Sequence, residues 1–494
     1  VAQEFLKSFL EAFARGESLY LSIREAREKL HGLEGQYPCA TWLPTIFQNP
    51  AASPPTWSVL APDVLNEPTL LSARKEGARI HQRRWILSIC LLIGVIIVGL
   101  RQFGVLQAWE LRAYDRMMGW RPTEVTDPRL VIVTVTEQDV QQQDAEQRRG
   151  SLSDASLSTL LAKLGPMQPR VIGLDIYRDF SVQVEQPQLA QQLASSDNLI
   201  AVCKTSSHDS DGIAPPPEIT DSQVGFSDFI SDSDQVIRRQ LLALTPEPAS
   251  LCQANYGFAS LITLNYLAFE DVEVTATAEG VLKVGDVVLD PIAKNFGGYS
   301  SIDAGGHQIM LNYRSLADPE MIAEHVTLGD ILAGRVDADA VRDRIVLIGT
   351  TAQSFGDFWQ IPPTMRNSEG DELAGVFMQA QMISQVLSTV LEGRSLIKTW
   401  SQGVEVAWIV ICTAISGGIA FWIGFLPFIH QALVKTITAF MAAELALFVV
   451  SWQLLVQWGY WVPWVPSAIA IALVIGATSF LSTKSFRQTD ESIR

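Results

Sequence analysis

The sequence predicts a layered α/β domain joined to four membrane-spanning helices, and two observations support this fold class. Four stretches of the 494-residue chain are mostly apolar over about 20 residues, which is enough to cross a bilayer. The long segment between the first and second stretches alternates short β-branched runs with helical patterns, as in α/β folds.

Two amphipathic helices and a strand are expected in residues 1–57. Phe5, Phe9 and Phe13 recur every four positions, and a second apolar repeat follows the break at Gly16–Ser18. The run TWLPTIF then predicts a strand, followed by a linker, residues 58–84. Because this segment buries too little to be a domain alone, we interpret it as the end of a larger one.

The expected spans cover residues 85–106, 403–425, 433–455 and 464–481. The first is no cleaved signal peptide, because a polar segment of 84 residues precedes it. Five basic residues stand just before it: Arg74, Lys75, Arg79, Arg83 and Arg84. The positive-inside rule therefore predicts that both termini, including the tail 482–494, are cytoplasmic and that 107–398 lies outside.

The charge of the chain is divided in the same way. Residues 107–398 contain 21 Lys and Arg against 40 Asp and Glu, a net charge of −19, whereas the remainder has 15 against 13. An acidic outer domain would repel phosphates, which argues against a nucleic-acid partner.

Four apolar runs predict strands of a parallel sheet that is covered on both faces: Arg129–Thr136, Pro169–Ile176, Asn198–Lys204 and Asp343–Thr350. Between the first two, LSDASLSTLLAKLG predicts a helix with a Ser/Asp start and a Gly stop. An insertion at Leu251–Leu311 is expected to carry one helix, YGFASLITLNYLAF, and a hairpin around Gly285–Asp286.

Several motifs of this segment resemble, in order, the second type of CHASE domain, an extracytoplasmic sensory module. They are ELRAYDRMMGWRPTEVTDPRLVIVTVTEQD, PRVIGLDIYRDF, VGFSDFISDSDQVIRRQLL, VRDRIVLIGTTAQSFGDFW and GVFMQAQMISQVL. One span before the module and three after it also match this family. The resemblance implies a multi-pass sensor of a bacterial plasma or inner membrane, with a small-molecule or protein stimulus and the possibility of homo-oligomers. The alternative is a non-catalytic membrane scaffold whose outer domain docks other proteins.

The stretch ARGESLYLSIREAREKLHGLEGQYPCATWLPTIFQNP resembles the C-terminal end of a CHAT domain, a caspase-like family. The catalytic His and Cys of that family lie upstream of this stretch, so no enzymatic activity is expected. His31 and Cys39 are close in sequence with Pro38 between them, and we interpret them as ordinary residues. The resemblance implies that a cytoplasmic CHAT-like domain, or a signalling partner, receives the signal.

No cofactor or metal site is predicted. The loop IGTTAQSFGDF lacks the Lys of a phosphate-binding loop, and no nucleophile elbow G-x-S-x-G occurs. The six His are scattered without metal-ligand spacing. Asp232 and Asp234 lack the further oxygen donors of a calcium loop, so SDSDQVIRRQ is interpreted as a hairpin turn.

Polar residues at four predicted strand ends are the candidate ligand-binding residues: Glu137, Asp175, Lys204, Thr350, Thr351, Ser354 and Asp357. In open α/β sheets, ligands bind beyond the carboxyl ends of the strands. The alternative is that Thr350 and Asp357 only cap turns and helix starts.

Cys203 and Cys252 are the two cysteines of residues 107–398, and we predict a disulfide between them. Two buried thiols are the alternative.

Glu444 is expected near mid-bilayer in the third span, about 13 Å deeper than Lys435. A carboxyl there should face the other helices, with Thr413 or Ser416 as a hydrogen-bond partner. It could serve helix packing alone or take part in signalling.

Overall fold

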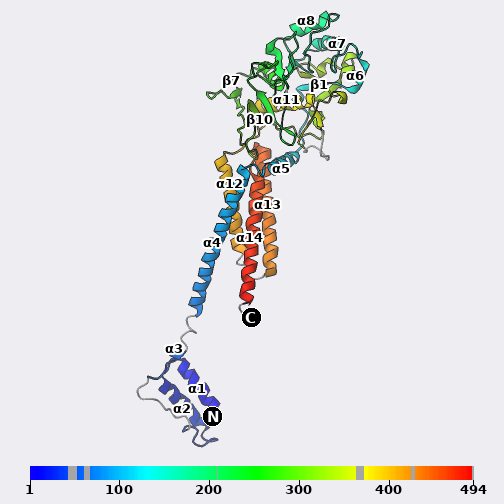
Figure 1. Cartoon of the computed structure of the whole chain (residues 1–494). Helices are drawn as coiled ribbons and strands as arrows, with labels where there is room; N and C mark the ends of the chain where they lie inside the picture. Colours follow the sequence, from blue (N-terminus) through cyan, green and yellow to red (C-terminus); the bar gives the residue numbers. More distant parts are fainter. Residues whose placement is uncertain (43–52, 61–66, 208–209, 363–371, 424–428, 492–494) are drawn as a thin grey trace. The chain divides into compact units, whose positions relative to one another are not determined.

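The computed structural model describes residues 1–42, 53–60, 67–207, 210–362, 372–423 and 429–491 (Figure 1). The chain divides into two compact units, Val1–Leu87 and Ser88–Arg494.

The first unit contains the two expected amphipathic helices. They are α1 (Ala2–Ala14) and α2 (Leu19–Leu30), which bury Phe13 and Leu30 against each other's apolar faces. Ser18 caps α2 by accepting a hydrogen bond from the backbone N–H of Leu21. The short helices η1 (His31–Leu33) and α3 (Trp57–Leu60) follow. The expected strand TWLPTIF lies largely outside the described residues, and its first two residues form a turn.

A six-stranded parallel sheet forms the centre of the second unit, in the order β11-β1-β12-β2-β3-β4. Its strands are β1 (Leu130–Val135), β2 (Val171–Asp175), β3 (Leu199–Cys203), β4 (Val224–Phe226), β11 (Glu324–Thr327) and β12 (Ile345–Thr350). The four strands expected from the sequence are confirmed as its centre. The edge strands β4 and β11 were not predicted, because they have only 3 and 4 residues and no apolar run.

Helices cover both faces of this sheet. On one face lie α7 (Asp154–Leu164), α8 (Pro187–Ser195) and α10 (Leu328–Leu332), whose apolar residues share a core with alternate residues of the strands. On the other face lie α9 (Phe258–Ala268) and α11 (Gly375–Glu392). The short helix α6 (Glu137–Gln142) begins directly after β1 with a capping box.

The helix expected within Leu251–Leu311 is α9, and it packs against the sheet. A Cβ at Gly173 of β2 would collide with Ile262 of α9, and one at Gly225 of β4 would collide with the backbone of Phe258. These two glycines let α9 approach the sheet closely, and Phe258 is fully buried there.

Three smaller antiparallel sheets complete the domain. They consist of β5 (Ile230–Ser231), β6 (Ile237–Ala243) and β10 (His307–Met310); of β7 (Val274–Ala276), β8 (Leu282–Val284) and β9 (Val287–Val288); and of β13 (Phe358–Gln360) and β14 (Glu372–Ala374). The hairpins expected at Ser231–Gln240 and at Gly285–Asp286 are both confirmed.

Four long helices carry the apolar stretches: α4 (Glu67–Gln102), α12 (Gln402–Ile423), α13 (Ile429–Trp458) and α14 (Trp464–Glu491). Among the described residues, three segments are long and apolar enough to cross a membrane: Arg83–Gln102, Gln402–Trp422 and Val434–Trp458. The apolar part of α14, Trp464–Ser479, is shorter.

The helix α5 (Gln107–Gly119) lies at the upper end of α13 and α14, beneath the sheet domain (Figure 1). It is separated from α4 by a turn at Gly104, whose φ of +73° favours glycine. The first apolar helix therefore ends at Gln102, four residues before the expected end of its span.

Candidate functional site

Five side chains gather at the carboxyl edge of the parallel sheet, and we call them the sheet-edge cluster: Asp175, Tyr177, Lys204, Asp228 and Asp357. They follow β2, β3, β4 and β12, which are neighbours in the sheet. Because parallel strands end at one edge, residues far apart in the sequence meet there.

Asp357 is held in place by two contacts. Its Oδ1 accepts a hydrogen bond from Nε1 of Trp359 at 2.8 Å. Its carboxylate also lies against the first residue of α11, where a Cβ at Gly375 would collide with it. Glycine at this position lets the carboxylate reach the start of the helix.

The carboxyl groups of this cluster have little positive charge nearby to balance their negative charge. Burial raises the pKa of Asp175 well above its ordinary value, and the neighbouring Asp357 raises it further. Burial also raises the pKa of Asp357 and of Asp228, while the ammonium of Lys204 opposes the rise at both. Lys204 thus acts on Asp357 and Asp228 but not on Asp175, so the cluster favours a proton or a hydrogen-bond donor from a ligand.

The other candidate residues lie where β1 and β12 end, and they join the segment after β12 to the end of β1. The backbone N–H of Ser354 donates to Oε2 of Glu137 at 3.3 Å. Oγ1 of Thr350 and the backbone N–H of Thr351 both donate to the carbonyl oxygen of Val135. These contacts favour the turn-capping interpretation for Thr350, whereas Asp357 belongs to the sheet-edge cluster.

Tyr177 and Asp228 were missed by the sequence reasoning. The hydroxyl of Tyr177 lies 2.6 Å from Oγ of Ser227, and Oδ2 of Asp228 accepts a hydrogen bond from the backbone N–H of Thr205. Asp228 follows β4, which is too short to predict. Tyr177 lies two residues beyond Asp175, the last residue of β2. Its position directly after a predicted strand is a sequence signal for it.

A disulfide joins Cys203 and Cys252, whose Cα atoms are 5.5 Å apart. Both residues are fully buried, and Cys203 directly precedes Lys204 of the sheet-edge cluster. The bridge therefore fastens the segment after β6 to the end of β3. Its presence in the native protein stays a prediction for chemical measurement.

A second cluster lies where the first apolar helix meets the sheet domain, and we call it the joint cluster: Arg101, Glu110, Glu405 and the carbonyl of Gly297. Nε of Arg101 donates to both carboxylate oxygens of Glu110 at 3.2 Å, and Nη1 donates to Oε2 of Glu405 at 2.8 Å. Nη2 donates to the carbonyl of Gly297. One guanidinium thus connects α4, α5, α12 and a loop of the sheet domain.

The joint cluster is almost fully excluded from solvent, since its three side chains are at most 8% exposed. Two carboxylates face one guanidinium, and Oε1 of Glu405 has no hydrogen-bond partner within the described part of the chain. Burial raises the pKa of Glu110 to about 7, although Arg101 opposes the rise. Trp461 packs against Gly297 and Gly298, where any Cβ would collide with its ring.

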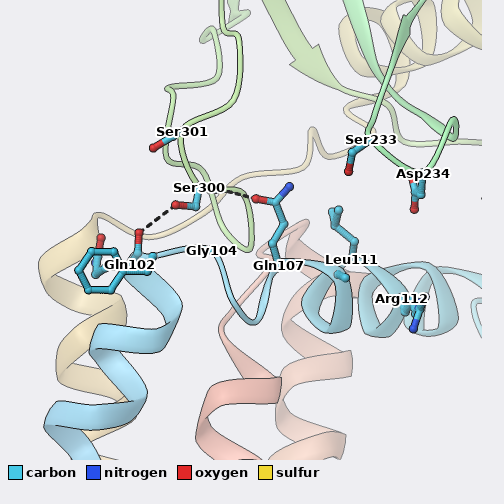
Figure 2. A pocket seen from close by; sticks show the side chains of 11 residues that line it. Gln102, Gly104, Gln107, Leu111, Arg112, Ser233, Asp234, Ser300 and Ser301 are labelled. Carbon is cyan, nitrogen blue, oxygen red and sulfur yellow. Dashed lines mark hydrogen bonds between the residues drawn. The ribbon is translucent and has the colours of Figure 1, made fainter.

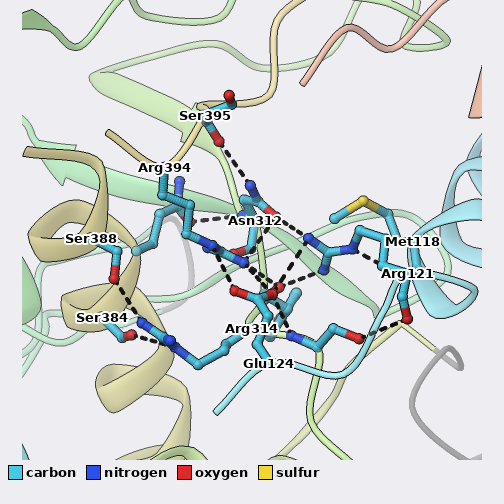
Figure 3. Close-up of polar contacts among 12 residues, drawn as sticks. Met118, Arg121, Glu124, Asn312, Arg314, Ser384, Ser388, Arg394 and Ser395 are labelled. Carbon is cyan, nitrogen blue, oxygen red and sulfur yellow. Dashed lines mark hydrogen bonds and ion pairs between the residues drawn. The ribbon is translucent and has the colours of Figure 1, made fainter. Parts of the chain in front are cut away.

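A polar network connects α5 with α11 through the segment after β10 (Figure 3). Nη1 of Arg121 donates to Oδ1 of Asn312 at 2.7 Å, and Nη2 of Arg394 donates to Oε1 of Glu124 at 2.9 Å. Nη2 of Arg314 donates to Oγ of Ser388 on α11 at 2.7 Å. Arg394 lies between α11 and α12, so this network reaches the segment that leads to the second apolar helix.

The model of one protein family, described as the CHASE2 domain, matches residues 92–419. The chain belongs to the CHASE2 family. The matched range begins inside α4, contains the whole sheet domain with both clusters, and ends inside α12. No curated protein and no solved structure matches the chain.

The CHASE2 match and the apolar helices together describe a multi-pass membrane protein with a sensory domain of this family. The first 91 residues, α13 and α14 lie outside the matched range, and no match supports the CHAT resemblance. Among the described residues, no group of three or more His, Cys, Asp or Glu is placed to hold a metal ion.

Glu444 does not make the hydrogen bonds that were expected. Oγ1 of Thr413 donates to the carbonyl of Ile409, and Oγ of Ser416 donates to the carbonyl of Thr413, so both hydroxyls bond their own helix. Oε1 of Glu444 is buried without a partner in the described chain. Hydroxyls in a helix commonly bond the carbonyl one turn back, which competes with contacts between helices.

Proposed function

We propose that this CHASE2 protein detects an extracytoplasmic stimulus at the sheet-edge cluster and transmits it to its membrane-spanning helices through the joint cluster. The observation that carries this proposal is the position of Arg101, which bonds two apolar helices and a loop of the sheet domain at once. A movement of the domain cannot leave α4 and α12 unaffected while these bonds persist.

The helix α11 provides a direct route between the two clusters. Its first residue, Gly375, contacts Asp357 of the sheet-edge cluster. Its 18 residues extend for about 27 Å, and the chain then continues through Arg394 to α12. Glu405 lies in the first turn of α12 and binds Arg101. A ligand that displaces Asp357 would therefore act on a rigid element that leads to the joint.

The ligand class follows from the charge of the sheet-edge cluster. Three carboxyl groups and one ammonium favour a ligand that brings hydrogen-bond donors or positive charge. Tyr177 is 37% exposed, and the ring of Trp359 packs edge-on against Phe229 at 5.0 Å. Aromatic rings beside carboxylates suit an amine or another small cation. The ligand would bias two arrangements of the helices that it binds unequally.

The direction of signalling in this proposal is inward, with four spans, both termini in the cytoplasm and residues 107–398 outside. The supporting observation is the basic cluster before the first span. The receiver would be a CHAT-like domain or a separate cytoplasmic partner. Reporter fusions after Arg84, Ser301 and Arg494 test this topology, and an active cytoplasmic reporter at Ser301 would refute it.

The test of the binding function is to purify the full chain from its native host and to identify any retained small molecule by mass spectrometry. We expect retention by the unmodified protein and by the control Asp339→Asn, a carboxyl that is 77% exposed. We expect loss from Asp357→Asn. Retention of a polypeptide in place of a small molecule would favour the scaffold function.

A further inference from the structure

A pocket of about 520 Å³ opens beside the point where the chain leaves the first apolar helix (Figure 2). Its walls come from the end of α4, the first turns of α5, the hairpin turn Ser233–Asp234 and the loop Ser300–Ser301. Neither the sheet-edge cluster nor the joint cluster contributes a residue to its lining.

The pocket offers hydrogen-bond donors that the described chain leaves unused. The guanidinium of Arg112 is exposed and has no ion pair or hydrogen bond with a described residue. Oε1 of Gln107 accepts from the backbone N–H of Ser300 at 3.0 Å, and its amide nitrogen is unpaired among those residues. Asp234, in contrast, has a cationic partner, because Arg238 donates to both of its oxygens at 2.8 and 2.9 Å, although the same guanidinium also binds Asp115 and Asp232. Of the charged residues that line the pocket, Arg112 is therefore the one without an ion-pair partner among the described residues.

The depth of the pocket is set by α4. The apolar segment of that helix ends at Gln102, which lines the pocket, so the pocket lies at the level of lipid headgroups. Phe103 at its edge is 86% exposed, and Val105 and Trp109 nearby are 62% and 56% exposed. Exposed aromatic and aliphatic side chains at this level suit contact with lipid.

We propose that this pocket binds the phosphodiester headgroup of a membrane phospholipid. Figure 2 shows Arg112 of α5 directed away from the Ser233–Asp234 turn. The phosphate would bind Arg112, the acyl chains would lie along α4 beside Phe103, and the polar tip of the headgroup would reach Gln107 and Ser233. Guanidinium binds phosphate with two parallel hydrogen bonds, which gives this contact both strength and direction.

The test is native mass spectrometry of the full chain in detergent with added phosphatidylglycerol, phosphatidylethanolamine or diacylglycerol. We expect one phospholipid to be retained and diacylglycerol, which has no phosphate, to be lost. Arg112→Gln should weaken phospholipid binding about tenfold, the effect of one lost charged hydrogen bond. The matched control is Arg116→Gln, one turn further along α5, exposed and outside the pocket lining.

Three results would overturn the proposal. Equal retention of phospholipid by Arg112→Gln and by the unmodified protein would show that Arg112 does not bind the phosphate. Equal binding of diacylglycerol would show that acyl chains alone are recognised. Displacement of the lipid by soluble glycerol 3-phosphate at similar concentration would identify a free phosphate ester as the ligand. If Arg112→Gln does not fold, Gln107→Leu tests the same pocket, and it should weaken binding of both phospholipids.

Discussion

The sheet-edge cluster and the joint cluster are both rich in carboxylates, but they differ in access to solvent. Asp175, Lys204 and Asp357 are half-buried at the end of a sheet. Arg101, Glu110 and Glu405 are almost fully buried and are bonded to one another. The sheet-edge cluster therefore leaves carboxyl groups available to an incoming ligand. In the joint cluster, the hydrogen bonds join four segments of the chain.

Because of this difference, we expect substitutions in the joint cluster to impair folding and substitutions in the sheet-edge cluster to impair ligand binding. A buried ion pair that loses one partner leaves an uncompensated charge in a low-dielectric environment, and this is severely destabilising. A carboxyl whose pKa is raised by burial is already disfavoured in its charged form, so its neutralisation should be tolerated.

The largest effect is expected for Arg101→Met. The substitution leaves Glu110 and Glu405 buried without a counter-charge, and we expect a loss of about 3–5 kcal/mol in the free energy of unfolding. Urea titration in detergent micelles would measure it. The control Arg116→Met removes an exposed cation and should change stability by no more than about 0.5 kcal/mol. Similar losses in both variants would contradict a structural role for the joint cluster.

The next effect concerns pH and Glu110. Its pKa is raised from 4.5 to about 7, so the unfolded chain releases this proton at lower pH than the folded protein does. Stability from this group is therefore full below about pH 4.5 and falls as pH rises to about 7, by about 3 kcal/mol. Glu110→Gln should flatten the profile in that window. An unchanged profile would show that Glu110 does not titrate there.

Removal of the disulfide should cost somewhat less. The bridge closes a loop with a sequence separation of 49 residues, and we expect Cys203→Ser with Cys252→Ser to lose about 2–4 kcal/mol. Because Cys203 adjoins Lys204, ligand retention should weaken while hydrogen exchange at α5 stays unchanged. Mass spectrometry of unreduced peptides would first show whether the native protein contains the bridge. Two freely alkylated cysteines would refute it.

The smallest effect is expected for Tyr177→Phe. It removes the hydrogen bond with Oγ of Ser227, and we expect a loss of about 0.5–1.5 kcal/mol. Tyr256→Phe serves as the control, because that residue is equally exposed and its hydroxyl makes no hydrogen bond with a described residue. A loss above about 3 kcal/mol in the free energy of unfolding would show that the sheet-edge cluster, like the joint cluster, is needed for folding.

The sequence predicted the centre of the sheet because Leu130–Val135 and Ile345–Thr350 are runs of apolar residues buried on both faces. Asp175, Lys204 and Asp357 could be named because they follow such runs. Asp228 could not, because β4 has only 3 residues.

The joint cluster was not predicted, although each of its charges is visible in the sequence. Arg101 and Glu405 are 304 residues apart, and each taken alone is an ordinary polar residue at the end of an apolar helix. Their pairing depends on how α4 and α12 pack, which periodicity does not specify. The partners of Glu444 could not be predicted for the same reason. Thr413 and Ser416 bond carbonyls of their own helix, and this depends on local geometry that periodicity does not specify.

In the proposed mechanism, the sheet-edge cluster acts on the spanning helices through Arg101. Spin labels on unnatural amino acids at Leu91 of α4 and Val410 of α12, both exposed on the apolar helices, report the distance between these helices. Asp175→Asn with Asp357→Asn mimics a neutralised cluster, and we predict that it shifts this distance distribution in the unmodified background and leaves it unchanged when Arg101 is replaced by Met. No shift in the unmodified background, or an equal shift in the absence of Arg101, would contradict the account.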